Sequence, residues 1–136
     1  MRVEVNWVEG MEFRAETGSG HTLTMDAPAD GGGADLGARP TELLLAAIGG
    51  CTGIDIVSIL QKMQQPVDGV KVKVQGDRAD EHPRRFTQLQ LHYVVSGKGL
   101  TEERVRRAVQ LSTEKYCSVL HSMNASYEYD FEIIEA

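Results

Sequence analysis

The sequence predicts an α+β protein with one domain over residues 1–136. Apolar and polar side chains alternate near the N-terminus and again in the middle of the chain, which is typical of half-buried β-strands. Between these regions, Thr41–Met63 is apolar nearly all round, which is typical of a buried helix. A second helical pattern begins at Thr101, and a last alternating segment follows it. The predicted order is therefore β-β-(β)-α-β-β-α-β.

Two or three antiparallel strands are expected in the first thirty residues. A glycine-rich turn, Gly18-Ser19-Gly20, predicts a hairpin between the later two. The segment Asp30–Gly37 is rich in glycine and predicts a flexible loop inside the domain. The apolar positions that alternate are Val3, Val5, Trp7, Met11, Phe13, Ala15, Leu23 and Met25.

The apolar helix should begin next to Pro40, because proline suits the first turn of a helix. A helix this apolar is unsuited to the surface of a small monomer, so we expect a partner chain to cover it together with its own sheet. Gly49, Gly50 and Gly53 weaken the helix by roughly 1 kcal/mol each relative to alanine. They also remove side chains around Cys51, which favours either close packing or room for a substrate.

The second half of the chain predicts two strands, a helix and a final strand. A charged turn or loop, Asp77–Arg85, separates the two strands. The hydroxyl of Thr101 is expected to cap a helix that runs to about Glu114. A break and a short helix should follow around Cys117–Met123. The alternating apolar positions of the strands are Val70, Val72, Val74, Leu89, Leu91, Tyr93, Val95, Tyr127, Tyr129, Phe131 and Ile133.

Composition excludes several functional classes. The formal net charge of -6 argues against nucleic acid as a partner, because phosphate contacts need a basic surface. No run of 18 or more apolar residues appears, so no membrane association is expected. The first ten residues lack the basic and apolar regions of a signal peptide, so we expect a cytoplasmic protein.

The two cysteines, Cys51 and Cys117, are the residues most suited to chemistry. They are either two buried free thiols, as cysteines often are, or a redox pair. In a redox pair, one thiolate attacks the O–O bond of a peroxide and becomes a sulfenic acid, with which the second thiol condenses. Apolar burial alone would leave Cys51 inert, so a nucleophile there needs a cation, for which Arg39 and Arg14 are candidates.

Cys117 and three polar residues near the cysteines could each have more than one role. Should Cys117 open the short helix, the helix N-terminus would stabilise its thiolate. His121, four residues later, could share a metal with Cys117, but two ligands do not make a zinc site, so no metal is expected. Glu42 either interacts with the helix dipole or holds an arginine at the site. Asp55 in the apolar helix needs a partner, either a basic group or one across a dimer interface.

Two cysteine segments resemble those of the OsmC/Ohr family, osmotically inducible and organic hydroperoxide resistance proteins. Arg39–Cys51 resembles the family's first cysteine helix, and Lys115–Val119 resembles its second cysteine motif. The strand and helix order over essentially the whole chain is also similar to that family. The segment Leu111–Cys117 most resembles the corresponding segment of the YhfA-like branch of the family.

The resemblance implies an OsmC-like fold, with antiparallel sheets packed on two central helices in an intertwined homodimer. It implies thiol-dependent reduction of organic hydroperoxides or hydrogen peroxide, in defence against oxidative stress, without a cofactor. Cys51 would be the peroxidatic thiol and Cys117 the resolving thiol. A dithiol, such as a dihydrolipoyl group, would be the reductant. Arg14 or Arg39 would activate Cys51, with Glu42 holding the arginine.

One departure from the family leaves a second hypothesis open. The peroxidase branches carry glutamate directly after the helix-opening proline, where this chain has Thr41, and Glu42 follows one residue later. A shift of one residue turns a side chain by about 100° around a helix. The alternative is a non-catalytic redox-sensing or apolar-ligand-binding protein on the same fold.

Overall fold

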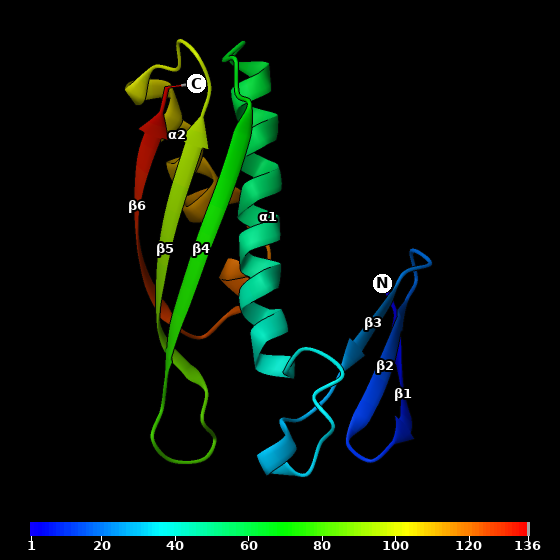
Figure 1. Ribbon diagram of the computed structural model, residues 1–136. Helices are drawn as coiled ribbons and strands as arrows, with labels where there is room; N and C mark the ends of the chain where they lie inside the picture. Colours follow the sequence, from blue (N-terminus) through cyan, green and yellow to red (C-terminus); the bar gives the residue numbers. More distant parts are fainter. Residues whose placement is uncertain (136) are drawn as a thin grey trace. The chain divides into compact units, whose positions relative to one another are not determined.

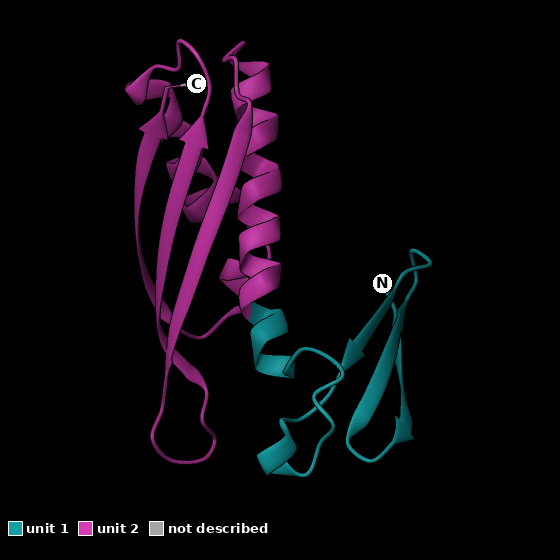
Figure 2. Cartoon of the chain, viewed as in Figure 1, with its two compact units in different colours: residues 1–44 teal, residues 45–136 magenta. Residues whose placement is uncertain are grey.

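The structure is a computed structural model that describes residues 1–135. It divides into two compact units, one of residues 1–44 and one from Leu45 onward (Figure 2). The single domain expected from the length of the chain stays a prediction. The order of strands and helices agrees with the sequence pattern throughout, including the third N-terminal strand.

The first unit holds an antiparallel sheet in the order β1-β2-β3. Its strands are β1 (Val3–Glu9), β2 (Glu12–Thr17) and β3 (Thr22–Met25). The predicted hairpin turn connects β2 and β3, and Gly20 there has φ +87, which residues with a Cβ rarely adopt. Every residue of β1 is exposed, including Trp7 at 67%. The predicted loop contains one short turn of 3-10 helix, Ala29–Gly31.

Helix α1 (Pro40–Lys62) matches the predicted helix to within one residue at each end. Its buried residues Ile48, Thr52, Ile56 and Leu60 recur every fourth position, so one stripe faces the core rather than the whole circumference. Ile54, on the same helix, is 72% exposed. By length and composition α1 is apolar enough to cross a membrane, a test that core helices also meet. The expectation of no membrane association stays a prediction.

The second sheet has the order β4-β5-β6 (Figure 1). Strand β4 (Gly69–Arg78) pairs with β5 (Phe86–Ser96) antiparallel, whereas β5 pairs with β6 (Ser126–Ile134) parallel. The expectation of purely antiparallel sheets is therefore wrong. Two parallel neighbours need a long crossover connection, and here α2 and the segment that carries Cys117 supply it.

Helix α2 (Glu102–Leu111) ends three residues earlier than predicted and continues as a π-helical turn, Ser112–Tyr116. Thr101 occupies the N-cap position, but the expectation that its hydroxyl caps the helix is wrong. Its hydroxyl and its amide both donate to Gln65 Oε1, the amide at 2.9 Å. The short helix predicted near Cys117 is a 3-10 turn, Leu120–Ser122.

One hydrophobic core joins β5 to both helices. The inward row of β5 is Leu89, Leu91, Tyr93 and Val95, each at most 2% exposed. These side chains form one cluster with the buried residues of α1 and α2 and with Cys117. The outward row of β5 includes His92, whose Nδ1 contacts Asp130 at 2.5 Å and whose Nε2 contacts Glu132 at 3.0 Å on the parallel neighbour β6.

We predict that Leu60→Ala lowers the free energy of unfolding by about 2–5 kcal/mol, because Leu60 is fully buried in the core and its loss leaves a cavity. The exposed neighbour Gln61 provides the control, since Gln61→Ala should change stability by less than about 0.5 kcal/mol. Urea denaturation measures both. Equal effects of the two substitutions would contradict the core described above.

We also predict that His92 stabilises the β5–β6 pair at low pH. Hydrogen bonds to Asp130 and Glu132 raise the pKa of His92 above its ordinary value of 6.5. The contribution of His92 to the free energy of unfolding is therefore complete below pH 6.5 and is lost as the pH rises through the raised pKa. The difference in unfolding free energy between the wild type and His92→Gln should shrink over that rise. A difference that is constant with pH would refute the interpretation.

Candidate functional site

Cys117 lies in the core of the second unit, directly after the π-helical turn. Its side chain is fully buried, and no disulfide joins it to Cys51. Its amide donates to the carbonyl of Ser112 at 2.8 Å, and its Sγ accepts the amide of Leu120 at 3.3 Å. The sulfur thus acts like the oxygen of a capping residue: it accepts the amide of the residue three positions later, where the 3-10 turn begins.

Cys51 lies on α1 and is half-buried, with its side chain against the same core. The two thiols, 66 positions apart in the sequence, are neighbours in the second unit, because Cys51 packs against the cluster that contains Cys117 and acts on its pKa. Their pairing in a redox reaction stays a prediction.

Burial raises the pKa of the Cys117 thiol to about 11, against the ordinary 9.0. The amide of Leu120 favours the thiolate, but the neighbouring Cys51 adds to the rise. The stabilised thiolate considered from the sequence required Cys117 to open the short helix, but that turn begins at Leu120. Desolvation of a charge outweighs one backbone donor at a fully buried sulfur.

The glycines around Cys51 leave space on the β4 side of α1. A methyl group on Gly50 would meet no atom within 4 Å, and one on Gly49 would touch Val74 at 3.4 Å. Two open grooves of about 480 and 420 Å³ lie there, and both are lined by Gly49, Gly50 and Val72. Their linings contain the neighbours of Cys51 and not Cys51 itself. The glycines therefore permit the close approach of α1 to β4 and leave an apolar groove next to the residues that flank Cys51.

Asp55 finds its partner within the chain, since the hydroxyl of Ser112 donates to Asp55 Oδ2 at 2.9 Å. Ser112 is fully buried, and its carbonyl is the acceptor for the amide of Cys117. Asp55 thus holds the segment that carries Cys117 against the helix that carries Cys51. Within the chain, the partner of Asp55 is therefore a serine, and the contact across a dimer interface considered from the sequence stays a prediction.

The carbonyl of Thr113, in the π-helical turn, accepts two side-chain hydrogen bonds. His121 Nε2 donates to it at 2.9 Å and the Tyr127 hydroxyl donates at 3.1 Å. A π-helical turn leaves carbonyls without their usual helical donors, so these side chains replace them. His121 is therefore a structural hydrogen-bond donor in this arrangement. Among residues 1–135, no cluster of three or more potential metal ligands occurs.

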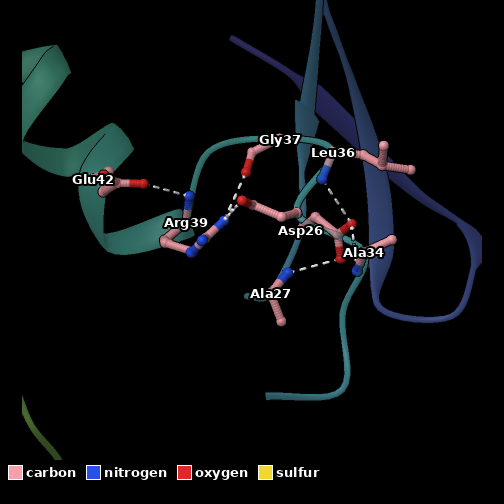
Figure 3. Close-up of polar contacts among 8 residues, drawn as sticks. Asp26, Ala27, Ala34, Leu36, Gly37, Arg39 and Glu42 are labelled. Carbon is pink, nitrogen blue, oxygen red and sulfur yellow. Dashed lines mark hydrogen bonds and ion pairs between the residues drawn. The ribbon is translucent and has the colours of Figure 1, made fainter. Parts of the chain in front are cut away.

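Arg39 and Glu42 lie in the first unit and bond to each other (Figure 3). Glu42 Oε1 accepts the backbone amide of Arg39 at 2.9 Å, as the third residue of a helix does in a capping box. The Arg39 guanidinium pairs with Asp35 at 2.8 Å and donates to the carbonyl of Gly37 at 3.0 Å. Glu42 therefore stabilises the N-terminus of α1, the first of the two roles considered from the sequence, and its role in holding an arginine at the thiols stays a prediction.

Asp26, which the sequence did not single out, organises the loop before α1 (Figure 3). It is 3% exposed, and its carboxylate accepts the amides of Ala27 at 2.7 Å, Leu36 at 3.1 Å and Ala34 at 3.2 Å. Burial opposes its ionisation, but these amides outweigh burial and lower the pKa of Asp26. A Cβ on Gly33 would stand 2.8 Å from this carboxylate, so the loop requires glycine there.

Arg14, on β2, is half exposed and lies 4.0 Å from Glu12. Arg14, Arg39 and Glu42 all belong to residues 1–44, whereas both cysteines belong to the other unit. The roles of these three residues at the thiols stay predictions.

The residues that the sequence analysis missed, Asp26 and Ser112, are small polar residues whose partners only the fold reveals. An acidic residue directly after a strand and before a glycine-rich loop was the one available signal.

Comparison with known proteins identifies close relatives over nearly the whole chain. A family model described as OsmC-like protein matches residues 31–132. Protein YhfA of Escherichia coli (strain K12) is 44% identical over 134 residues, which cover 96% of this chain and 97% of that protein. A hypothetical protein from Aquifex aeolicus VF5 is 32% identical with a TM-score of 0.87, covering 99% of this chain and 96% of that one.

A more distant neighbour is the organic hydroperoxide resistance protein OhrB of Bacillus subtilis. Its structure superimposes with a TM-score of 0.64 and covers 97% of this chain and 98% of that one. At 17% identity, this similarity shows a shared fold alone.

We predict that Cys117 is a slow nucleophile. In the Cys51→Ser variant, iodoacetamide should alkylate Cys117 at pH 8 at least about tenfold more slowly than in the urea-unfolded chain, because burial, the largest cause of the raised pKa, lowers the thiolate fraction of Cys117 even without Cys51. Mass spectrometry of quenched samples gives both rates. Equal rates in folded and unfolded protein would contradict the burial of this thiol.

Proposed function

The chain belongs to the OsmC-like family, and we propose from this membership that it is a thiol-dependent peroxidase that reduces organic hydroperoxides, and hydrogen peroxide as well. The observation that carries the proposal is that two free thiols, Cys51 and Cys117, pack in the same hydrophobic core. Organic hydroperoxide resistance proteins share the fold. Family membership supports the class of reaction, and the paired thiols support the mechanism.

The reaction consumes one peroxide and two thiols. The thiolate of Cys51 attacks the O–O bond of ROOH, which releases ROH once the alkoxide takes a proton and leaves Cys51 as a sulfenic acid. Cys117 then attacks the Cys51 sulfur, forming the disulfide and releasing the hydroxyl group as water with the Cys117 proton. A dithiol reductant of dihydrolipoyl type returns the disulfide to two thiols and becomes a disulfide itself.

The surroundings of the two thiols indicate which one attacks the peroxide and which one resolves the sulfenic acid. Cys51 is half-buried, and its neighbours Gly49 and Gly50 line an apolar groove, from which a small peroxide would approach the thiol. Cys117 is fully buried with a raised pKa, so it remains a protonated thiol until the sulfenic acid forms next to it. A resolving thiol with these properties avoids direct oxidation by peroxide. The groove is mainly apolar, which favours organic over water-like peroxides.

We propose a homodimer as the active form. Apolar side chains are exposed on α1 and on β1, among them Ile54 at 72% and Trp7 at 67%. A second copy of the chain is the partner that the family resemblance implies, and its surface would cover side chains of this kind. The arginine that activates Cys51, Arg14 or Arg39, would then come from either protomer. The cytoplasm, where thiols are kept reduced, suits this chemistry.

The alternative is a redox sensor or apolar-ligand carrier without useful turnover. The observation that favours it is that Arg39 and Glu42, two of the residues expected to activate Cys51, are already bonded to other groups. Arg39 is paired with Asp35, and Glu42 is bonded to the Arg39 amide. An arginine engaged in this way has fewer N–H groups left to donate to a peroxide. In the sensor, peroxide would convert the pair to a disulfide once per molecule, without a physiological reductant.

We predict that purified protein consumes cumene hydroperoxide catalytically with dihydrolipoamide, and that Cys51→Ser lowers the rate at least 1000-fold, because the attacking sulfur is lost. Cys117→Ser should permit one turnover and accumulate Cys51 sulfenic acid, which dimedone traps. Peroxide disappearance and intact mass measure the two effects.

Ser118→Ala, next to Cys117, serves as the control and should retain the wild-type rate. Turnover that persists in Cys51→Ser would overturn the proposed mechanism. One equivalent of peroxide consumed, with no recycling by any dithiol, would favour the sensor.

A further inference from the structure

Ser112 bridges the two cysteine-bearing segments at positions next to the cysteines themselves. Its hydroxyl lies 3.3 Å from the carbonyl oxygen of Thr52, the residue that follows Cys51 on α1. Its own carbonyl accepts the amide of Cys117 at 2.8 Å. Ser112 is fully buried, so water does not compete for these bonds. One residue therefore joins the main chain beside the first thiol to the main chain of the second.

Asp55 is the nearer of the two acceptors of the Ser112 hydroxyl. The distance from Ser112 Oγ to Asp55 Oδ2 is 2.9 Å, and a hydroxyl has a single proton to donate. A carboxylate oxygen is also a stronger acceptor than a main-chain carbonyl. Asp55 lies one helical turn after Cys51, so their side chains share one side of α1. The carboxylate therefore directs the Ser112 hydroxyl to the side of α1 that carries the thiol.

We propose that Asp55 and Ser112 are positioning residues for the disulfide between Cys51 and Cys117, and that their hydrogen bond sets how stable this disulfide is. The inference rests on the proposed thiol pair. A disulfide requires a narrow range of distances and dihedral angles between its two residues. Holding both main chains in place raises the effective concentration of one thiol at the other. Asp55 and Ser112 act through the main chain of the cysteines and take no part in the exchange of sulfur bonds.

The next residue, Thr113, provides a comparison within the same π-helical turn. It is also fully buried, but its hydroxyl donates to the carbonyl of Val109 at 3.0 Å, four residues earlier in the chain. That bond is local and joins no second element. The hydroxyl of Ser112 instead reaches α1, about 60 positions away in the sequence. Two buried hydroxyls of one turn therefore differ in whether they contact the helix of Cys51.

The test measures the equilibrium between the purified protein and glutathione at pH 7. The two protein thiols become the disulfide while one oxidised glutathione becomes two reduced molecules. Ser112→Ala and Asp55→Ala should each lower the equilibrium constant about tenfold, because the lost hydrogen bond no longer places Cys117. A tenfold fall corresponds to a reduction potential about 30 mV less negative. Alkylation of quenched samples followed by mass spectrometry gives the ratio of disulfide to dithiol.

Three further variants separate positioning from a general loosening of the core. Asp55→Asn keeps an oxygen that can accept the Ser112 hydroxyl, so its constant should stay within about threefold of the wild type. The double variant of Asp55→Ala and Ser112→Ala should lose no more than either single variant, since both remove the same bond. Thr113→Val, the matched control, removes a buried hydroxyl of the same turn and should retain the wild-type constant.

Three outcomes would overturn the inference: wild-type constants in Ser112→Ala and Asp55→Ala, an equal fall in Thr113→Val, or a wild-type protein that forms no disulfide with oxidised glutathione. Ser112→Ala should fold, because Asp55 is only partly buried and can turn to water. The measurement uses no peroxide. The expected pattern in a protein that never consumes peroxide would therefore uphold the two positioning residues and refute the peroxidase.

Discussion

The thiol site depends on one buried serine. Ser112 donates its hydroxyl to Asp55 on α1, and its carbonyl accepts the amide of Cys117. Two elements that are far apart in sequence are thereby held together by directed bonds as well as by apolar packing. Apolar packing alone is tolerant of small shifts, whereas hydrogen bonds inside a dry core have one favourable geometry. The position of Cys117 relative to the helix of Cys51 therefore follows from the bonds of Ser112.

The same dry core that positions the sulfurs also determines their charge. Burial disfavours a thiolate at Cys117, and the amide of Leu120 offsets this only in part. An environment of that kind keeps a thiol protonated and available for a neighbouring electrophilic sulfur. It also makes every additional donor near the sulfur effective, because few others compete in a medium of low dielectric constant.

Most of the fold could be predicted from the pattern of apolar residues, because their spacing along the sequence indicates which face of a helix or strand is buried. Both helices and all six strands follow that pattern, and α1 differs from its prediction by one residue at each end. The parallel pairing of β6 could not be read in this way, since Tyr127 and Phe131 alternate equally in either direction. The cysteines could be selected from their motifs. The partners of Asp55 and Glu42 could not, since a serine and a main-chain amide have no signature in the sequence.

The parallel pairing of β5 and β6 has a consequence for biosynthesis. The central strand of this sheet, β5, waits for a neighbour that is made after α2, at Ser126–Ile134. A nascent chain on the ribosome can form the hairpin of β4 and β5 early, but its sheet remains open along one edge until β6 emerges. Such an edge pairs readily with other chains. Emergence of β6, rather than synthesis of either cysteine, is thus the event that completes this sheet.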